Sequence, residues 1–140
     1  MPKKQKDNSK KKLKVLVVED DEPTLESVVF KLKQRGFLVD PAKDGEEALA
    51  KLQKIKYSAI LLDLRLPKGN GYQFLEEKNK DSNLREIPVV VFSNLSLRVF
   101  IDWALELGVK GYLVKAHHSI SEIADEFQKC IKEGSCRVDY

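Results

Sequence analysis

The stretch KVLVVEDDEP, residues 14–23, decides the fold, because an apolar run ends directly in four acidic side chains. The run LKVLVV at residues 13–18 shows no polar alternation beyond Lys14, and SAILL at 58–62 and IPVVVF at 87–92 are also apolar on both faces. Strands that are buried on both sides have this composition, which indicates a parallel sheet covered by helices on each face.

Segments of helical period separate these apolar runs. Leu25, Val28, Val29 and Leu32 follow the i, i+3, i+4, i+7 spacing of an amphipathic helix. This first helix is predicted to begin at residue 23 and to end at residue 36. Further helices are predicted from about residue 44, over 72–79, over 96–107 and over 119–132, with short strands at 37–40 and 111–114. Five strands thus alternate with five helices, which predicts a doubly wound α/β fold with right-handed crossovers.

The length of 140 residues suits one domain. Residues 1–12 contain six Lys and one Asp and are expected to form a basic, disordered tail. The domain is expected over residues 13–133, with a short C-terminal tail at 134–140. No apolar run approaches the roughly 20 residues that cross a bilayer, so we expect a cytoplasmic protein without membrane insertion.

The cysteines and histidines near the C-terminus carry no clear signal. Cys130 and Cys136 lack the paired spacing and the His partners of a zinc site, so both are expected to be reduced thiols. His117 and His118 lie at a predicted junction between a loop and a helix, and we expect them to be ordinary surface residues.

Polar side chains follow four of the predicted strands, at the edge where open parallel sheets bind their ligands. They are Glu19 and Asp20, Asp63, Ser93 and Asn94, and Lys115. If the first and third strands are neighbours, three carboxylates converge. Two unit charges about 4 Å apart repel by about 4 kcal/mol at an effective dielectric constant of about 20. One lysine does not neutralise three carboxylates, and oxygen ligands at the edge of a cleft suit Mg²⁺.

A simpler interpretation is that acidic residues after a strand only cap the next helix. This explains Asp21 and Glu22, directly before Pro23. It does not explain why Ser93 and Lys115 occupy the ends of two other strands. We therefore favour the metal site for the acidic residues that directly follow the strands.

Four motifs together carry a resemblance to a known family. They are VLVVEDDEP at 15–23, ILLDLRLPKGNGYQFL at 60–75, IPVVVFSN at 87–94 and GYLVKA at 111–116. In this order and at these spacings the chain resembles the receiver domain of two-component response regulators over about residues 13–133. The resemblance implies a flavodoxin-like fold with the strand order 2-1-3-4-5.

The resemblance also implies a role for each strand-end residue. Asp63 would be the phosphoacceptor, and the Mg²⁺ ligands would be Glu19, Asp20, Asp63 and the main-chain carbonyl of Arg65. Lys115 and Ser93 would contact phosphoryl oxygens. Tyr112 would respond by rotating inward, which alters the outer face of the fourth helix, fifth strand and fifth helix. Such a chain is a signalling switch that catalyses only its own phosphorylation and dephosphorylation.

The resemblance further implies a sensor histidine kinase or phosphotransfer protein as the donor and an unidentified downstream protein as the target. The outer face is also a candidate dimer surface. We expect no nucleic-acid contact within this chain, because its length leaves no room for a DNA-binding output domain. Either it is a stand-alone receiver or it belongs to a longer regulator.

Two departures from the family pattern keep alternatives open. Ala116 follows Lys115 where Pro is usual, and Asn94, which with Arg65 flanks access to the site, replaces a small residue. A receiver-shaped interaction module with little phosphorylation is therefore one alternative. A Mg²⁺-dependent phosphatase of the haloacid-dehalogenase type is another, but that family needs an Asp two residues after the nucleophile, where this chain has Arg65.

Overall fold

The computed structural model describes residues 12–68 and 70–140. The basic segment predicted at residues 1–12 lies, apart from Lys12, outside the described residues. Within them, the elements run β1 (Lys14–Val18), α2 (Glu22–Gln34), β2 (Leu38–Ala42), α3 (Gly45–Lys54), β3 (Ala59–Leu62), α4 (Gly71–Lys80), β4 (Val89–Ser93), α5 (Arg98–Glu106), β5 (Gly111–Val114), the 3₁₀ turn η2 (Lys115–His117) and α6 (Ile120–Glu133).

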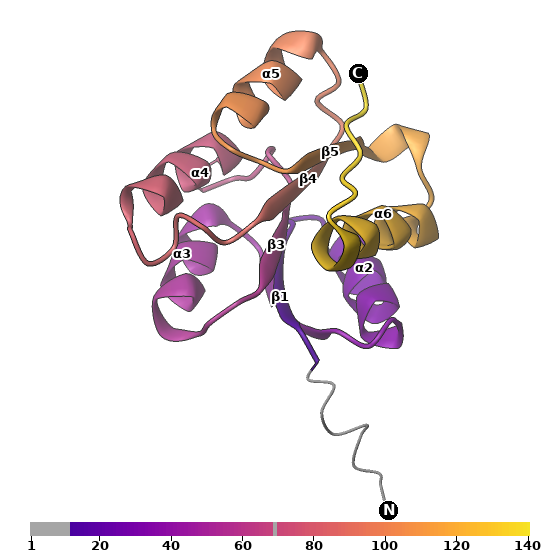
Figure 1. The fold of residues 1–140 in the computed structure, drawn as a ribbon, viewed down its shortest axis with the longest axis horizontal. Helices are drawn as coiled ribbons and strands as arrows, with labels where there is room; N and C mark the ends of the chain where they lie inside the picture. The colour runs from indigo at the N-terminus through magenta and orange to yellow at the C-terminus, as the bar shows by residue number, and fades with distance from the viewer. Residues whose placement is uncertain (1–11, 69) are drawn as a thin grey trace, which may run out of the picture.

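The strands form one parallel sheet in the order β2-β1-β3-β4-β5, which confirms the doubly wound α/β fold and the predicted strand order. Helices α2 and α6 cover one face, and α3, α4 and α5 cover the other (Figure 1). Strand β1 lies between β2 and β3, with Val18 opposite Leu62 of β3. The first and third strands are therefore neighbours, as the convergence of the carboxylates requires.

The two faces of the sheet have separate cores, which explains the unbroken apolar runs. In β1, Val15 and Val17 pack beneath α2 and α6, whereas Leu16 and Val18 pack beneath α3 and α4. Each of these side chains is fully buried. Burying one such side chain contributes about 1.5–3 kcal/mol, so a polar residue on either face of β1 would be costly.

Side-chain caps fix where the helices begin. Asp21 accepts a hydrogen bond from the Thr24 N–H at the start of α2, and Asp44 caps α3 in the same way. Asn70 accepts from two N–H groups at the start of α4. Ser119 and Glu122 form a capping box at α6. Each cap satisfies backbone donors that a helix leaves free, so the loops at the carboxyl edge of the sheet are held in place.

No helix among the described residues is both long enough and apolar enough to cross a membrane. The backbone of the same residues contains no cis peptide bond, so the bond between Lys115 and Ala116 is trans.

Candidate functional site

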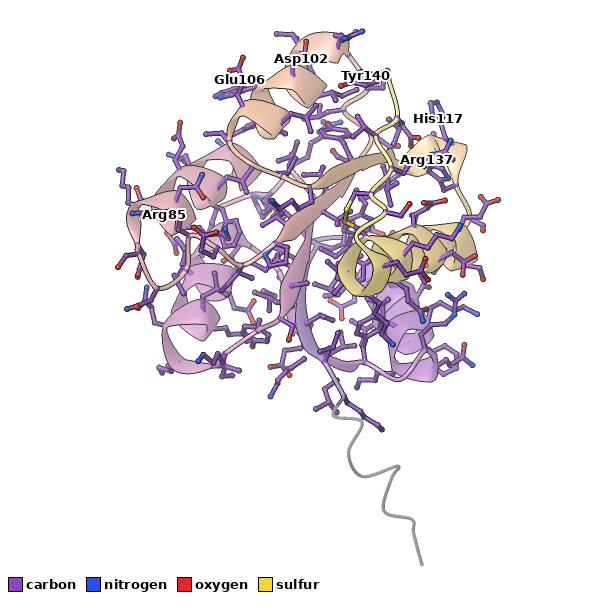
Figure 2. The ribbon with its side chains drawn as sticks, viewed as in Figure 1. Arg85, Asp102, Glu106, His117, Arg137 and Tyr140 are labelled. Carbon is purple, nitrogen blue, oxygen red and sulfur yellow. A yellow bond between two sulfur atoms is a disulfide. The ribbon has the colours of Figure 1, made fainter. Side chains whose placement is uncertain are left out.

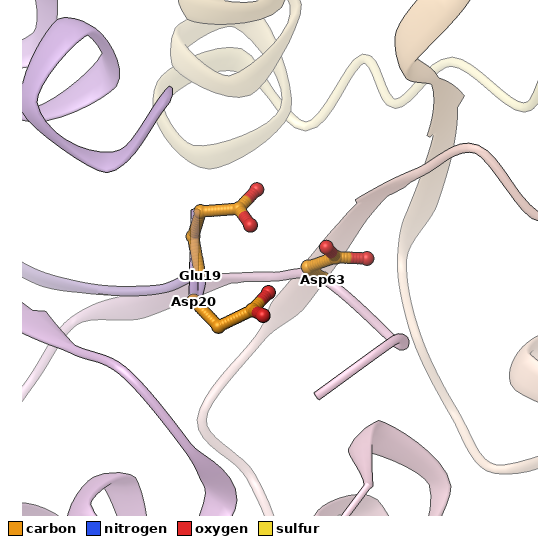
Figure 3. Close-up of side chains that lie close together, drawn as sticks. All are labelled: Glu19, Asp20 and Asp63. Atoms are coloured by element: carbon orange, nitrogen blue, oxygen red, sulfur yellow. The ribbon is translucent and has the colours of Figure 1, made fainter. Parts of the chain in front are cut away.

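An acidic cluster lies at the carboxyl edge of the sheet, where β1 and β3 end. Glu19, Asp20 and Asp63 each place one carboxylate oxygen within 4.8 Å of the other two (Figure 3). Backbone hydrogen bonds hold them there: the Asp63 N–H donates to the Val18 carbonyl at 2.9 Å, and the Glu19 N–H donates to the Ala42 carbonyl at 3.0 Å. The predicted convergence of these three residues is therefore observed.

Lys115, which follows β5, reaches across the sheet edge to this cluster. Its Nζ lies 3.0 Å from Asp63 Oδ2 and also forms an ion pair with Glu19. Burial disfavours the charged ammonium group, but the two carboxylates outweigh it, so the pKa of Lys115 lies above its usual value. Burial is also the main reason that the pKa of Glu19 is raised, against the opposing effect of Lys115.

The second carboxylate oxygens of Glu19 and Asp63 bind backbone donors. Glu19 Oε2 accepts from the Asp21 N–H at 3.0 Å, and Asp63 Oδ1 accepts from the Arg65 N–H at 3.1 Å. Glu19 and Asp63 are buried, whereas Asp20 is exposed. Among the described residues, Lys115 is the one basic side chain that pairs with this cluster. The pocket keeps an excess of negative charge on oxygen donors, and this donor set fits a hard divalent cation such as Mg²⁺.

Ser93, the last residue of β4, and Asn94, directly after it, lie near this cluster and have different environments. Ser93 is fully buried, and its hydroxyl accepts a hydrogen bond from the Leu95 N–H at 3.2 Å. Asn94 is exposed, and its side-chain carbonyl accepts from the Ala116 N–H at 3.1 Å. This hydrogen bond connects the end of β4 to the turn that carries Lys115. The sequence placed Asn94 beside the site but did not predict this contact.

Tyr112 of β5 points into the protein. Its side chain is fully buried, and its hydroxyl donates to the Leu95 carbonyl at 2.6 Å. Burial is the main reason that the pKa of Tyr112 is raised; the nearby Tyr72 and Asp63 add to the shift, and a hydrogen bond with Ser93 opposes it. The resemblance implies that Tyr112 rotates inward in response to phosphorylation, and this rotation stays a prediction. In this structure the Tyr112 side chain already lies inward, close to Ser93.

The acidic cluster forms one side of a pocket of about 830 Å³ whose other side is aromatic. The Tyr72 and Trp103 rings stack with centroids 4.0 Å apart, and Phe100 lies beside them in the lining. The Tyr72 hydroxyl donates to the Phe100 carbonyl at 2.7 Å, and burial raises the pKa of Tyr72 to about 12. Sequence periodicity placed Tyr72 and Trp103 on helices, but it could not show that they meet beside the carboxylates.

Two predictions near the C-terminus are wrong. Cys130 and Cys136 form a disulfide rather than free thiols. His118 is not an ordinary surface residue: its side chain is 7% exposed, and its Nε2 lies 2.6 Å from Asp139 Oδ2. The reason is that Gly134, with φ of 75°, turns the chain back along the sheet after α6. Cys136 is thereby brought against α6 and Asp139 against His118.

Comparison with known proteins identifies the family to which this fold and site belong. The family described as the response regulator receiver domain matches residues 15–127. The chain belongs to this family. It is 37% identical to the phosphate regulon transcriptional regulatory protein PhoB of Escherichia coli over 102 residues, which are 73% of this chain and 44% of that protein. The chain therefore spans less than half the length of this relative.

Solved structures resemble the fold over nearly their whole length. The phosphorylated cyanobacterial phytochrome response regulator RcpA is 27% identical with a TM-score of 0.81, covering 89% of this chain and 97% of that one. The Mn²⁺-bound form of response regulator Rcp1 is 27% identical with a TM-score of 0.78, covering 86% of this chain and 95% of that one. One neighbour is thus phosphorylated and another binds a divalent cation.

Proposed function

We propose that this chain is a phosphorylation-operated signalling switch. In it, Asp63 accepts a phosphoryl group from a phosphohistidine on a sensor histidine kinase or phosphotransfer protein. The observation that best supports this is the convergence of Glu19, Asp20 and Asp63 within 4.8 Å of one another beside Lys115. Phosphoryl transfer depends mainly on positioning and on positive charge around the transferred group. The chain promotes only its own phosphorylation and dephosphorylation and is not otherwise an enzyme.

In the proposed reaction, one Asp63 carboxylate oxygen attacks the phosphorus atom of the phosphohistidine. The new O–P bond forms as the P–N bond breaks, and the leaving imidazole keeps that electron pair and takes a proton from water. Lys115 Nζ, 3.0 Å from Asp63 Oδ2, lies within reach of an oxygen of the transferred group. The Arg65 N–H, which donates to Oδ1, keeps the acceptor carboxylate in one orientation.

The same carboxylates are the proposed Mg²⁺ ligands, together with the main-chain carbonyl of Arg65. Glu19 and Asp63 are buried and held by backbone donors, whereas Asp20 faces solvent. A site with few protein oxygens and an open side suits a cation that keeps several water ligands. When bound, Mg²⁺ supplies positive charge to the phosphoryl oxygens. Arg65 and Asn94 flank the entrance and limit the approach of water to the product.

Ser93 and Tyr112 are the proposed switch. The new phosphoryl oxygens on Asp63 are strong acceptors that draw the Ser93 hydroxyl away from the Leu95 N–H, which it binds at 3.2 Å. Tyr112 responds because its hydroxyl binds the Leu95 carbonyl in the same loop. Motion of that loop changes the face formed by α5, β5 and α6. We propose that a downstream protein binds this face, and that a dimer would use it too.

The proposal is tested by incubating the protein with a small acyl phosphate, with and without Mg²⁺, and measuring the intact mass. We expect one phosphoryl adduct that requires Mg²⁺ and is absent from Asp63→Ala. The matched control is Asp102→Asn, which removes an exposed carboxylate on α5 and keeps the adduct. An adduct that persists in Asp63→Ala contradicts the assignment. If the unmodified protein forms no adduct, the chain is instead a receiver-shaped interaction module.

This role places the chain in the cytoplasm with the catalytic part of its kinase. A cytoplasmic location also bears on the cysteines, because the disulfides of cytoplasmic proteins are usually transient and sensitive to redox conditions.

A further inference from the structure

The last residues of the chain lie along the free edge of the sheet. We call residues 135–140 the C-terminal strap. After α6, this segment passes β5 and ends beside α5 (Figure 1). The Tyr112 N–H donates to the Arg137 carbonyl, and the Asp139 N–H donates to the Tyr112 carbonyl, both at 2.9 Å. Val138 lies opposite Tyr112 in a parallel bridge. The strap therefore pairs with β5 as an added strand segment.

A buried aspartate anchors the strap. Asp139 is 6% exposed, and its Oδ2 accepts from the Val114 N–H at 2.9 Å and lies 2.6 Å from His118 Nε2. Its Oδ1 accepts from Arg137 Nε at 2.6 Å. A buried carboxylate is stable only when its oxygens are satisfied in this way. Asp139 thus fixes the strap to both β5 and the turn that follows it.

The end of the strap also reaches α5. The guanidinium carbon of Arg98 lies 4.3 Å from the centre of the Tyr140 ring, an exposed cation–π contact. Figure 2 shows Tyr140 beside α5. The strap therefore bridges η2, β5 and α5.

The strap covers main-chain groups that an edge strand would otherwise expose. Strand β5 has β4 on one side and no further strand of the sheet on the other. Without the strap, the N–H groups of Tyr112 and Val114 and the Tyr112 carbonyl would face solvent or another strand. Free edges of this kind pair with other chains. The strap closes this edge, and it does so at the residue whose side chain points to Ser93.

A disulfide holds the strap close to its docking place. Cys130, in the last turns of α6, is bonded to Cys136 at the start of the strap, with the Cα atoms 4.3 Å apart. Cys130 is buried, whereas Cys136 is half-buried and is the more exposed residue of the pair. The bond closes a loop that contains Gly134. While it is closed, the strap can move only a short distance from β5.

We propose that Cys130 and Cys136 form a redox-controlled latch, which a dithiol reductant opens to release the C-terminal strap from β5. A thiolate of the dithiol attacks Cys136 Sγ, and Cys130 leaves as a thiolate that takes up a proton. The second thiol of the reductant then attacks the mixed disulfide and releases Cys136. The protein disulfide gains two electrons and two protons, and the dithiol is oxidised to its own disulfide.

The expected size of the effect follows from the loop that the disulfide closes. The closed disulfide lowers the conformational entropy of the detached strap. For a loop this short, this lowers the population of the detached strap by about 10- to 50-fold. Reduction should therefore raise the population of the detached strap by this factor. It should raise the exchange rate of the amides that the strap protects by the same factor. The rest of the domain should be unaffected, because the strap contributes no residue to the main cores beyond Cys136 and Val138.

The test is amide hydrogen exchange on the full chain, with no phosphodonor, after oxidation by a small disulfide and after reduction by dithiothreitol. Mass measurement of alkylated protein gives the thiol state. The reporters are the Tyr112, Val114 and Asp139 amides. The control is the Leu38 amide at the opposite sheet edge, which donates to the Leu13 carbonyl at 2.9 Å. We expect the three reporters to exchange about 10- to 50-fold faster after reduction, with the control unchanged.

Two variants separate the latch from general stability. In Cys136→Ser, the reporter amides should exchange rapidly under both oxidising and reducing conditions, so their exchange should not respond to the reductant. Asp139→Asn should speed exchange at Val114 while it still forms the disulfide. Equal exchange at Tyr112 and Val114 in the two redox states overturns the proposal. Acceleration of the Leu38 control, or cysteines that stay unpaired under the oxidant, overturns it as well. None of these results depends on phosphorylation, so the proposed function stands or falls separately.

Discussion

Replacing Asp20 with Asn should have opposite effects on stability with and without Mg²⁺. Asp20 is exposed and makes no ion pair among the described residues, yet its carboxylate lies within 4.8 Å of both Glu19 and Asp63. At that separation two unit charges repel by about 0.9 kcal/mol in bulk water and by about 3.5 kcal/mol at an effective dielectric constant of about 20. Because Asp20 faces solvent, the lower figure applies to each of its two pairs.

Asp20→Asn removes both repulsions and also the weaker attraction of Asp20 to Lys115, with which it makes no ion pair. We therefore expect this variant to be more stable than the unmodified protein by about 1 kcal/mol in chelator at low salt, and by less at high salt. With Mg²⁺ the order reverses. An ion that binds only the folded state stabilises it by about 2.7 kcal/mol at 100 times its dissociation constant. The variant has lost one of the carboxylates proposed to bind Mg²⁺, so it should gain less.

The assay is urea unfolding with chelator and with a series of Mg²⁺ concentrations, with the slope of each transition used to check that the unfolded states are comparable. The matched control is Asp21→Asn, one residue along. Asn caps helices as well as Asp does, so the cap on the Thr24 N–H remains and only the charge near the helix start is lost. We expect a small loss of stability and an unchanged response to Mg²⁺. If Asp20→Asn is the less stable protein in chelator, the reasoning about charge in this pocket is wrong.

Three further predictions concern packing, the buried charge and pH. A Cβ on Gly71 would lie 2.6 Å from the Leu64 Cα, so Gly71→Ala should destabilise the fold by about 1–3 kcal/mol in urea unfolding, and an unchanged midpoint would contradict this. Lys115→Ala leaves two buried carboxylates unpaired and should cost about 3 kcal/mol in chelator, partly recovered with Mg²⁺; equal loss in both conditions would count against it. Burial raises the pKa of Asp139, but hydrogen bonds, chiefly from the Arg137 side chain, outweigh this and lower it from 3.8. The stability that Asp139 contributes should be complete above pH 3.8 and should be lost as the pH falls through the lowered pKa. The chemical shift of the Val114 amide, which donates to Asp139, would report this titration. Asp139→Asn should show no such titration.

Most of the fold was predictable because burial on both sides leaves a mark on the sequence. The strand predicted at 58–62 is observed at Ala59–Leu62, within the predicted range. The strand predicted at 37–40 extends instead through Pro41 to Ala42. Proline lacks the N–H that a central strand needs, but β2 is an edge strand, so Pro41 can occupy it without loss of a ladder bond. The strand order implied by the family resemblance already placed this strand at the edge of the sheet, so its extension through Pro41 is compatible with that prediction.

The acidic site was predictable for a related reason, since each of its residues directly follows a strand whose end is marked in the sequence. The C-terminal strap was not predictable in this way. Its bonds join Asp139 to Val114 and His118, and no periodicity connects residues so far apart. The one local signal was Gly134 between Cys130 and Cys136, because a left-handed residue after a helix turns the chain back on itself. The usual state of cysteines in cytoplasmic proteins weighed against that signal.

Strand β5 connects the acidic cluster to the C-terminal strap. It spans only Gly111–Val114, and its next residue, Lys115, binds the acidic cluster. On its outer side the backbone of Tyr112 and the N–H of Val114 bind the strap. A strand this short that is bonded on both sides cannot shift at one residue without moving the next. If Asp63 is phosphorylated as proposed, any rearrangement of the outer face that moves β5 must also distort the strap bonds. The strap would then set part of the free-energy cost of the proposed switch.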